Sequence, residues 1–175
     1  PTETVYGLGG NGLNKEASKK IYAAKGRPSD NPLILHIADM EQFYPLIKTD
    51  NAKIIARAEA LADVFWPGPL TMILPKADNI PYETTGGLDT VAIRMPSHLV
   101  ARALLQECKM PIAAPSANLS GRPSPTSASH VIEDMNGRIE MIIDGGDVGI
   151  GVESTIIDLT GEVPMLLRPG FVTPE

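Results

Sequence analysis

The sequence predicts an α/β protein built on a twisted, open, mixed sheet with helices packed against it. Two observations carry this prediction. Short β-branched runs alternate with amphipathic stretches over most of the chain, and the final third holds successive strand patterns with little helix between them. With 175 residues, 43% hydrophobic and 21% charged, the chain has the size of one domain with one core. We expect a single domain over residues 1–175.

The first helix is predicted over residues 15–25. Asn14 is a favoured N-cap residue, apolar side chains recur at helical spacing along one face, and Gly26 suits the end of the helix. Residues 2–6 have the pattern of a strand end or a loop. A strand is expected over residues 33–37, directly after the loop that follows this helix.

The remaining elements follow from the same two periodicities. Strands are predicted over residues 70–74, 90–95, 110–114, 139–143, 152–159 and 165–167. Helices are predicted over residues 39–47, 51–65 and 97–108, begun by Asp39, Asn51 and Ser97, and from Thr126 or Ser127 to Met135. Residues 76–88 are predicted to form a loop, and Trp66 is expected to pack in the core.

The glycines at positions 7, 9 and 12 match G-x-G-x-x-G, a pattern typical of dinucleotide-binding folds. The residues before them, Thr2 to Thr4, are too polar for the buried first strand of a parallel sheet. The first acidic residue after the second strand, Asp39, also lies farther along the chain than the usual ~20 residues. The pattern therefore favours ordinary turn glycines.

Composition excludes several classes of function. Cys108 is the only cysteine, so no internal disulfide and no multi-cysteine zinc site can form, and the three histidines show no metal-ligand spacing. A net charge of -6 argues against a general nucleic-acid binder, although five of the 15 Lys and Arg residues lie within residues 15–27. No apolar run approaches the ~20 residues of a membrane span, so we expect a cytoplasmic protein without a membrane partner.

The stretch KGRPSDNPLILH, residues 25–36, is the strongest candidate for a binding site. Arg27 and Asn31 each precede a proline, which moves both out of the helical region and makes the segment a loop. Arg27 offers a planar fork of donors, and Lys25, two residues away, can lie on the same side as a point charge. We expect the two to form an anion clamp, against the alternative of a solvated basic loop.

Two more arginines lie one or two residues before a proline at strand ends. Arg94 lies inside an apolar strand and must be paired or face a cleft, because an unpaired buried charge costs several kcal/mol. Arg168 precedes Pro169, and a polar loop holding Ser116 and Asn118 follows another strand. Such cations around polar loops predict a cleft for a polyanion or for two anions, and hence a binder or transferase of anionic small molecules. The loops also carry Ser124, Ser154 and Thr155.

Five blocks of the sequence, the last of them in two parts, occur together as a set. They are PTETVYGLG, KGRPSDNPLILH, TVAIRMP, PSANLSGRPSPT, ESTIIDL and LLRPG. In this order, over nearly the whole chain, they resemble the YrdC-type L-threonylcarbamoyladenylate synthase family. The resemblance implies an enzyme, a nucleotidyltransferase that forms threonylcarbamoyl-AMP and pyrophosphate from ATP, L-threonine and bicarbonate. It also implies Mg²⁺ bound with ATP, and tRNA or tRNA-modifying proteins as partners.

The resemblance also assigns residues. The K-x-R and S-x-N signature of the family corresponds to Lys25, Arg27, Ser116 and Asn118. The threonine side would be formed by Thr4, His36, Arg94, Ala114 and Ser154. The nucleotide would be held by Arg27, Asn31, Thr90, Ser116, Ser124 and Arg168. The family often begins with a strand and a helix before PTET, so we expect residues upstream of Pro1 to be missing from this numbering.

Two alternatives remain open at this point. A structured-RNA-binding module would use the basic residues 15–27 without any turnover of ATP. A related carbamoyl-transfer domain would keep the fold and change the donor, but such domains usually belong to larger chains with zinc-binding segments, and this chain has one cysteine.

Overall fold

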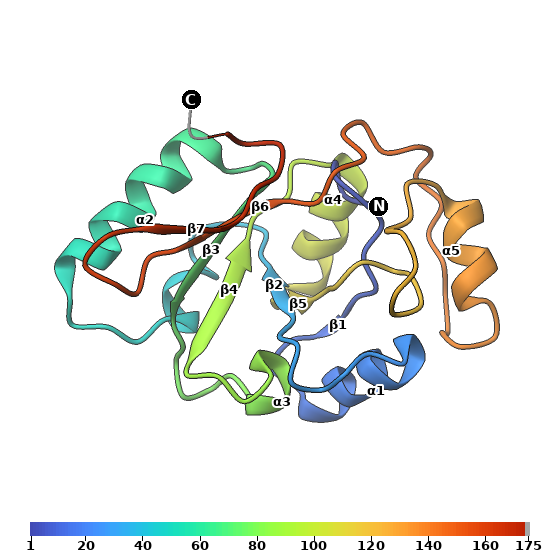
Figure 1. Ribbon diagram of the computed structural model, residues 1–175, viewed down its shortest axis with the longest axis horizontal. Helices are drawn as coiled ribbons and strands as arrows, with labels where there is room; N and C mark the ends of the chain where they lie inside the picture. Colours follow the sequence, from blue (N-terminus) through green and yellow to red (C-terminus); the bar gives the residue numbers. More distant parts are fainter. Residues whose placement is uncertain (174–175) are drawn as a thin grey trace.

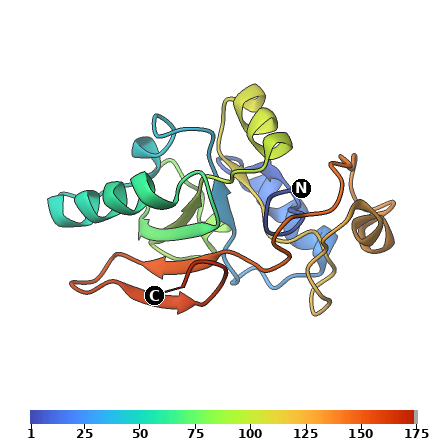
Figure 2. The ribbon, with the colours of Figure 1, turned by 90° about the horizontal axis from the view of Figure 1, so that it is seen from above.

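The computed structural model describes residues 1–173, and these form a seven-stranded mixed sheet (Figures 1 and 2). Its strands are β1 (Gly10–Asn11), β2 (Ile34–His36), β3 (Leu70–Pro75), β4 (Thr90–Arg94), β5 (Ile112–Ala113), β6 (Thr155–Asp158) and β7 (Met165–Arg168). They lie in the order β1-β5-β2-β4-β3-β6-β7. The β2–β4 and β3–β6 pairs are parallel, and the other pairs are antiparallel. The predicted fold class is confirmed.

Five helices surround this sheet within the described residues. They are α1 (Lys15–Lys25), α2 (Ala52–Phe65), α3 (Tyr82–Thr85), α4 (Leu99–Cys108) and α5 (Ala128–Met135). Figure 1 shows α1 and α3 together at one end of the strands, α2 beside the β3–β7 half, and α5 at the far side of the molecule. None of these helices is both long enough and apolar enough to cross a bilayer.

The ends of α1 are defined by its cap residues, as the sequence predicts. The Asn14 side chain accepts hydrogen bonds from the backbone N–H groups of Glu16 and Ala17, at 2.9 and 3.4 Å. Gly26 adopts a left-handed conformation with φ 60°, which costs glycine little and ends the helix. Lys25 is consequently the last helical residue, and Arg27 begins the loop.

The core lies between the central strands and the helices. Leu35, Met72, Leu74 and Ile93 from β2, β3 and β4 are fully buried. Trp66 packs in the same cluster, and its indole N–H donates to the Leu70 carbonyl at 2.7 Å. The predicted packing role of Trp66 is confirmed.

Two predicted elements are wrong in kind. Residues 39–47 form only a short 3-10 turn, Tyr44–Leu46, because Pro45 cannot donate to a longer helix and disfavours helical geometry before it. Residues 139–143 have the apolar pattern of a strand but pair with no strand within residues 1–173. A strand depends on a partner, so pattern alone does not make one.

Other differences concern ends and short elements. The stretch 76–88, predicted as a loop, contains α3, which stops at the left-handed Gly86. The N-cap of α4 is His98 rather than Ser97. Residues 10–11, within the predicted glycine turn, form β1, and the strand predicted over residues 152–159 is only β6. The strand predicted over residues 110–114 is likewise reduced to β5.

Candidate active site

One cavity of about 360 Å³ collects the three arginines singled out from the sequence. Its wall is formed by the N-terminal segment, the loop after α1, strands β2 and β4, the segment after β5, and the residues around β6 and β7. Nine predicted site residues line it: Thr4, Arg27, Asn31, His36, Arg94, Ala114, Ser116, Ser154 and Arg168. The predicted cleft with clustered cations is therefore present.

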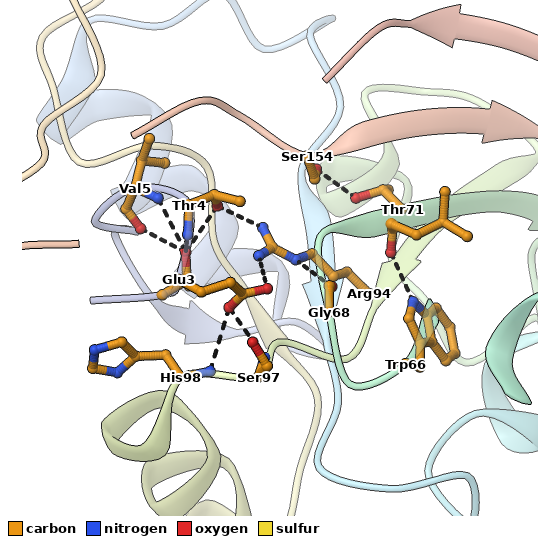
Figure 3. Close-up of polar contacts among 12 residues, drawn as sticks. Glu3, Thr4, Val5, Trp66, Gly68, Thr71, Arg94, Ser97, His98 and Ser154 are labelled. Carbon is orange, nitrogen blue, oxygen red and sulfur yellow. Dashed lines mark hydrogen bonds and ion pairs between the residues drawn. The ribbon is translucent and has the colours of Figure 1, made fainter. Parts of the chain in front are cut away.

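Arg94 forms the buried side of the cavity with a side chain that is 4% exposed, and Figure 3 shows its polar contacts with Glu3, Thr4 and Gly68. Its Nη2 lies 2.5 Å from a carboxylate oxygen of Glu3, and its Nη1 donates to Thr4 Oγ1 at 2.9 Å. The Nε group donates to the carbonyl of Gly68 at 3.2 Å. Arg94 was expected to be paired or to face a cleft, and in the structure it is paired and also lines the cavity.

The Glu3 carboxylate is held from a second direction. Its other oxygen accepts from the backbone N–H groups of Ser97 and His98, at 3.0 and 3.3 Å. Burial alone would raise the pKa of Glu3, but the charge of Arg94 and the hydrogen bonds from Arg94 and the Ser97 N–H outweigh it and hold the pKa below its ordinary value. Glu3 therefore stays ionised and fixes the start of α4 to the N-terminal segment.

His36 completes the buried side as a neutral ring. It is 6% exposed, and Nδ1 lies 3.2 Å from the carbonyl oxygen of Ile34. Burial, reinforced by the nearby charge of Arg94, lowers its pKa to about 3. Ser154, another residue of the cavity lining, is 2% exposed and shares a 2.7 Å hydrogen bond with Thr71 (Figure 3).

Arg27 also lines the cavity, and its side chain is more exposed than that of Arg94. Its Nε and Nη2 groups donate to the carbonyl oxygens of Asn31 and Pro32, at 3.2 and 3.1 Å. These bonds close the loop that the two prolines favour and aim the half-buried guanidinium at the cavity. Because only two of its five N–H groups are used by described residues, Arg27 retains donors for an anion.

Arg168 lies near Arg27 and is more fully occupied. Its Nε and Nη2 groups donate to the carbonyl oxygen of Ser154, at 3.0 and 2.8 Å, and Nη2 also reaches Ser154 Oγ at 3.1 Å. Its Nη1 lies 2.5 Å from Glu153, which also accepts from Ser124 Oγ at 2.8 Å. The sequence reasoning missed Glu153, although it directly precedes Ser154 in one of the quoted blocks.

Lys25 does not fulfil the predicted clamp with Arg27. Only 2% of it is exposed, and its Nζ donates to the backbone carbonyl of Asn118 at 2.6 Å and to that of Ser116. Burial, with a smaller contribution from the charge of Arg27, lowers its pKa to about 8. Lys25 therefore lies behind the cavity wall and holds the loop that presents Ser116.

Three further predicted residues lie outside the cavity lining. Asn118 is 7% exposed and donates to the carbonyls of Leu119 and Arg122, at 2.9 and 2.8 Å, so it shapes its own loop. Thr90 begins β4. Ser124 reaches the cavity only through Glu153.

The arrangement suits charge neutralisation better than acid–base chemistry. The lining holds three arginines, one carboxylate, and a histidine with a strongly lowered pKa. Within residues 1–173, no group of three or more His, Cys, Asp or Glu side chains could hold a metal ion. Sheet and cavity together define an α/β protein with an arginine-lined hollow for anionic ligands.

The chain belongs to the Sua5/YciO/YrdC family, whose model carries the description "Telomere recombination" and matches residues 1–170. It is 62% identical to the threonylcarbamoyl-AMP synthase of Pyrococcus abyssi and 58% identical to that of Bacillus subtilis, each across the whole of this chain. The chain spans about half the length of these relatives, 50% in both cases. The resemblance drawn from the sequence blocks is confirmed.

Solved structures agree with the fold. Sua5 from P. abyssi, crystallised as a complex with L-threonine, superposes with a TM-score of 0.93 at 61% identity. The match covers 97% of this chain and 49% of that one. YciO from E. coli matches 98% of this chain and 81% of its own, with a TM-score of 0.81 and 25% identity.

Proposed function

We propose that the protein is an L-threonylcarbamoyladenylate synthase, forming threonylcarbamoyl-AMP and pyrophosphate from ATP, L-threonine and bicarbonate. The observation that carries this proposal is that one cavity is lined both by residues expected for threonine and by residues expected for ATP. The synthases of P. abyssi and B. subtilis, both close in sequence, support it.

The two sides of the cavity suit the two substrates. The buried side offers the charged Arg94, the hydroxyls of Thr4 and Ser154, and the neutral His36, a set suited to one small zwitterion such as threonine. The open side offers Arg27 with uncommitted donors, suited to the phosphates of ATP. A threonine bound first would lie deeper than the nucleotide.

The chemistry asks chiefly for positioning. The amine of threonine combines with bicarbonate to give a carbamate and water, and a carbamate oxygen then attacks the α-phosphorus while pyrophosphate leaves. Both reactants are anionic, so the guanidinium groups reduce their repulsion and stabilise charge on the transferring phosphoryl group. A carbamate is already nucleophilic, so no strong general base is required.

Mg²⁺ is proposed to arrive with ATP. This ion is usually held by substrate phosphates, water, and one or two carboxylates. The described residues supply no acidic cluster, so the triphosphate would provide most of its ligands. The ion would neutralise charge on the departing pyrophosphate.

The product would serve the modification of adenosine in tRNA. Threonylcarbamoyl-AMP is an activated acyl donor, so we propose that a tRNA-modifying protein and tRNA act after it in the cytoplasm. The exposed lysines at positions 15, 19 and 20 of α1 offer a basic surface for RNA phosphates.

The test is pyrophosphate release from ATP by the purified protein, with mass detection of threonylcarbamoyl-AMP. We expect release only when L-threonine and bicarbonate are both present. Release that ignores either substrate would contradict the proposal. Tight, salt-dependent RNA binding without turnover of ATP would favour the binding-module alternative instead.

A further inference from the structure

Within residues 1–173, Glu153 is the only carboxylate that lines the cavity, and it pairs with one of the three lining arginines, Arg168. It lies in the loop just before β6 and was not among the residues expected from the sequence. A carboxylate in a hollow meant for a triphosphate would repel the phosphates if they lay beside it. The position of Glu153 therefore indicates which part of a bound nucleotide, the phosphates or the nucleoside, lies next to it.

The Glu153 side chain is accessible enough to water that it does not need its protein partners in order to be solvated. Its side chain is 38% exposed and that of its partner Arg168 is 34% exposed, so either could be satisfied by water. One carboxylate oxygen accepts from Ser124 Oγ at 2.8 Å and the other lies 2.5 Å from Arg168 Nη1. A carboxylate has about four acceptor sites, so about two of them stay available to a ligand.

The same contacts remove donors from this end of the cavity. Ser124 has one hydroxyl proton, and Glu153 accepts it, so the serine oxygen can only accept from a ligand. Arg168 uses four of its five N–H groups on Ser154 and Glu153. This end therefore presents mainly acceptors, whereas Arg27 presents free donors.

Phosphate oxygens need donors, and ribose hydroxyls can supply them. Carboxylates that accept hydrogen bonds from a ribose hydroxyl recur in dinucleotide-binding proteins. We propose that Glu153, with Ser124 held as an acceptor, is a specificity-determining residue that binds the ribose hydroxyls of ATP. This inference rests on the proposed function, because it presupposes that ATP binds in the cavity.

The experiment compares ATP, 2′-deoxy-ATP and 3′-deoxy-ATP by calorimetric titration of the wild-type protein and of Glu153→Gln. We expect the wild type to bind ATP at least about tenfold more tightly than one of the deoxy analogues, the loss that a hydrogen bond to a charged group accounts for. In Glu153→Gln this ratio falls to about threefold or less, because neutral acceptors bind more weakly. The affinity ratio of ATP to the deoxy analogue should fall by the same factor in Glu153→Gln whether the titrations contain Mg²⁺ or a chelator.

Glu107→Gln is the matched control, since Glu107 is exposed on α4 and outside the cavity lining. It should keep the wild-type ratio, and thermal melts of both variants check that they are folded. Tighter ATP binding by Glu153→Gln with an unchanged ratio would show that the carboxylate only repels phosphate, and would overturn the inference. An effect seen only with Mg²⁺ would assign Glu153 to the metal and overturn it as well. A wild type that binds no ATP would instead refute the proposed function.

Discussion

Two arginine–glutamate pairs of equal length each include an arginine that lines the cavity. Arg94 and Glu3 lie 2.5 Å apart with side chains 4% and 12% exposed, and Arg168 and Glu153 lie 2.5 Å apart with side chains 34% and 38% exposed. The chemistry is the same and the surroundings differ. Breaking a buried pair leaves a charge without water, whereas breaking an exposed pair lets water replace the partner. Burial therefore decides which pair supports the fold and which one serves a ligand.

The largest effect is expected from Glu3→Ala. This variant leaves Arg94 buried without its counter-ion, so the free energy of unfolding should fall by about 3–5 kcal/mol. Urea denaturation of the variant and the wild type measures the loss. A loss below about 1 kcal/mol, which is typical of exposed pairs, would show that the Arg94–Glu3 pair contributes no more to stability than an exposed pair does.

Lys25→Met should have the next largest effect. The substitution roughly keeps the volume of the side chain but leaves the carbonyls of Ser116 and Asn118 without their donor. Since an unpaired buried polar group costs about 1–3 kcal/mol, we expect a loss near 2 kcal/mol in the free energy of unfolding, measured in urea. A stable variant with only weakened ATP binding would restore Lys25 to the clamp predicted from the sequence.

His36 should make the buried side sensitive to acid. Its pKa is about 3 in the folded protein against 6.5 ordinarily, so between these values the unfolded chain binds a proton that the folded chain does not. The contribution of His36 is complete above pH 6.5 and falls by about 1.4 kcal/mol per unit as the pH drops toward 3.

The measurement is the free energy of unfolding between pH 6.5 and 5, in the wild type and in His36→Asn. In His36→Asn, the free energy of unfolding should fall less steeply as the pH drops, because the contribution of His36 is gone. A matched variant of the exposed His130, His130→Asn, should keep the wild-type pH dependence. Identical slopes in the wild type and both variants would contradict the assignment.

A loss of binding without a loss of stability is expected for Arg27→Ala. We expect the dissociation constant of ATP to rise at least about tenfold, or about 1.4 kcal/mol, with the melting temperature nearly unchanged. Arg57→Ala is a close control, because Arg57 is also half-buried and also donates to two backbone carbonyls, but lies outside the cavity lining. A large drop in melting temperature for Arg27→Ala alone would make Arg27 a structural residue.

The smallest change in stability is expected from Glu153→Ala. An exposed pair contributes about 0–1 kcal/mol, so this variant should unfold within about 1 kcal/mol of the wild type. The difference should shrink further in 1 M salt, because salt screens exposed charges. Urea denaturation at low and high salt measures both quantities. A loss as large as that of Glu3→Ala would remove the contrast between the pairs.

Elements with clear local signals were predicted well from the sequence. The helices begun by Asn14 and Asn51 appear with those caps, because capping depends only on neighbouring residues. Residues 139–143 carry a strand pattern and form no strand within residues 1–173, because pairing depends on distant parts of the chain.

The site residues likewise differ in whether the local sequence or contacts with distant residues determine their role. Arg27, Arg94 and Arg168 could be selected because each cation lies one or two residues before a proline at a strand or loop boundary. The inward direction of the Lys25 side chain could not be predicted, because it is set by backbone carbonyls more than ninety residues away in the sequence. Glu153 was missed because one acid among 21 acquires meaning only through its contacts with Ser124 and Arg168.

The most direct test of the two-sided cavity is calorimetric titration with ATP and L-threonine, singly and together, in the wild type and in Arg27→Ala. We expect both ligands to bind to the protein at the same time. The substitution should raise the dissociation constant of ATP and leave that of threonine within about twofold of the wild-type value. Mutual exclusion of the two ligands, or an equal loss of both in Arg27→Ala, would contradict the account.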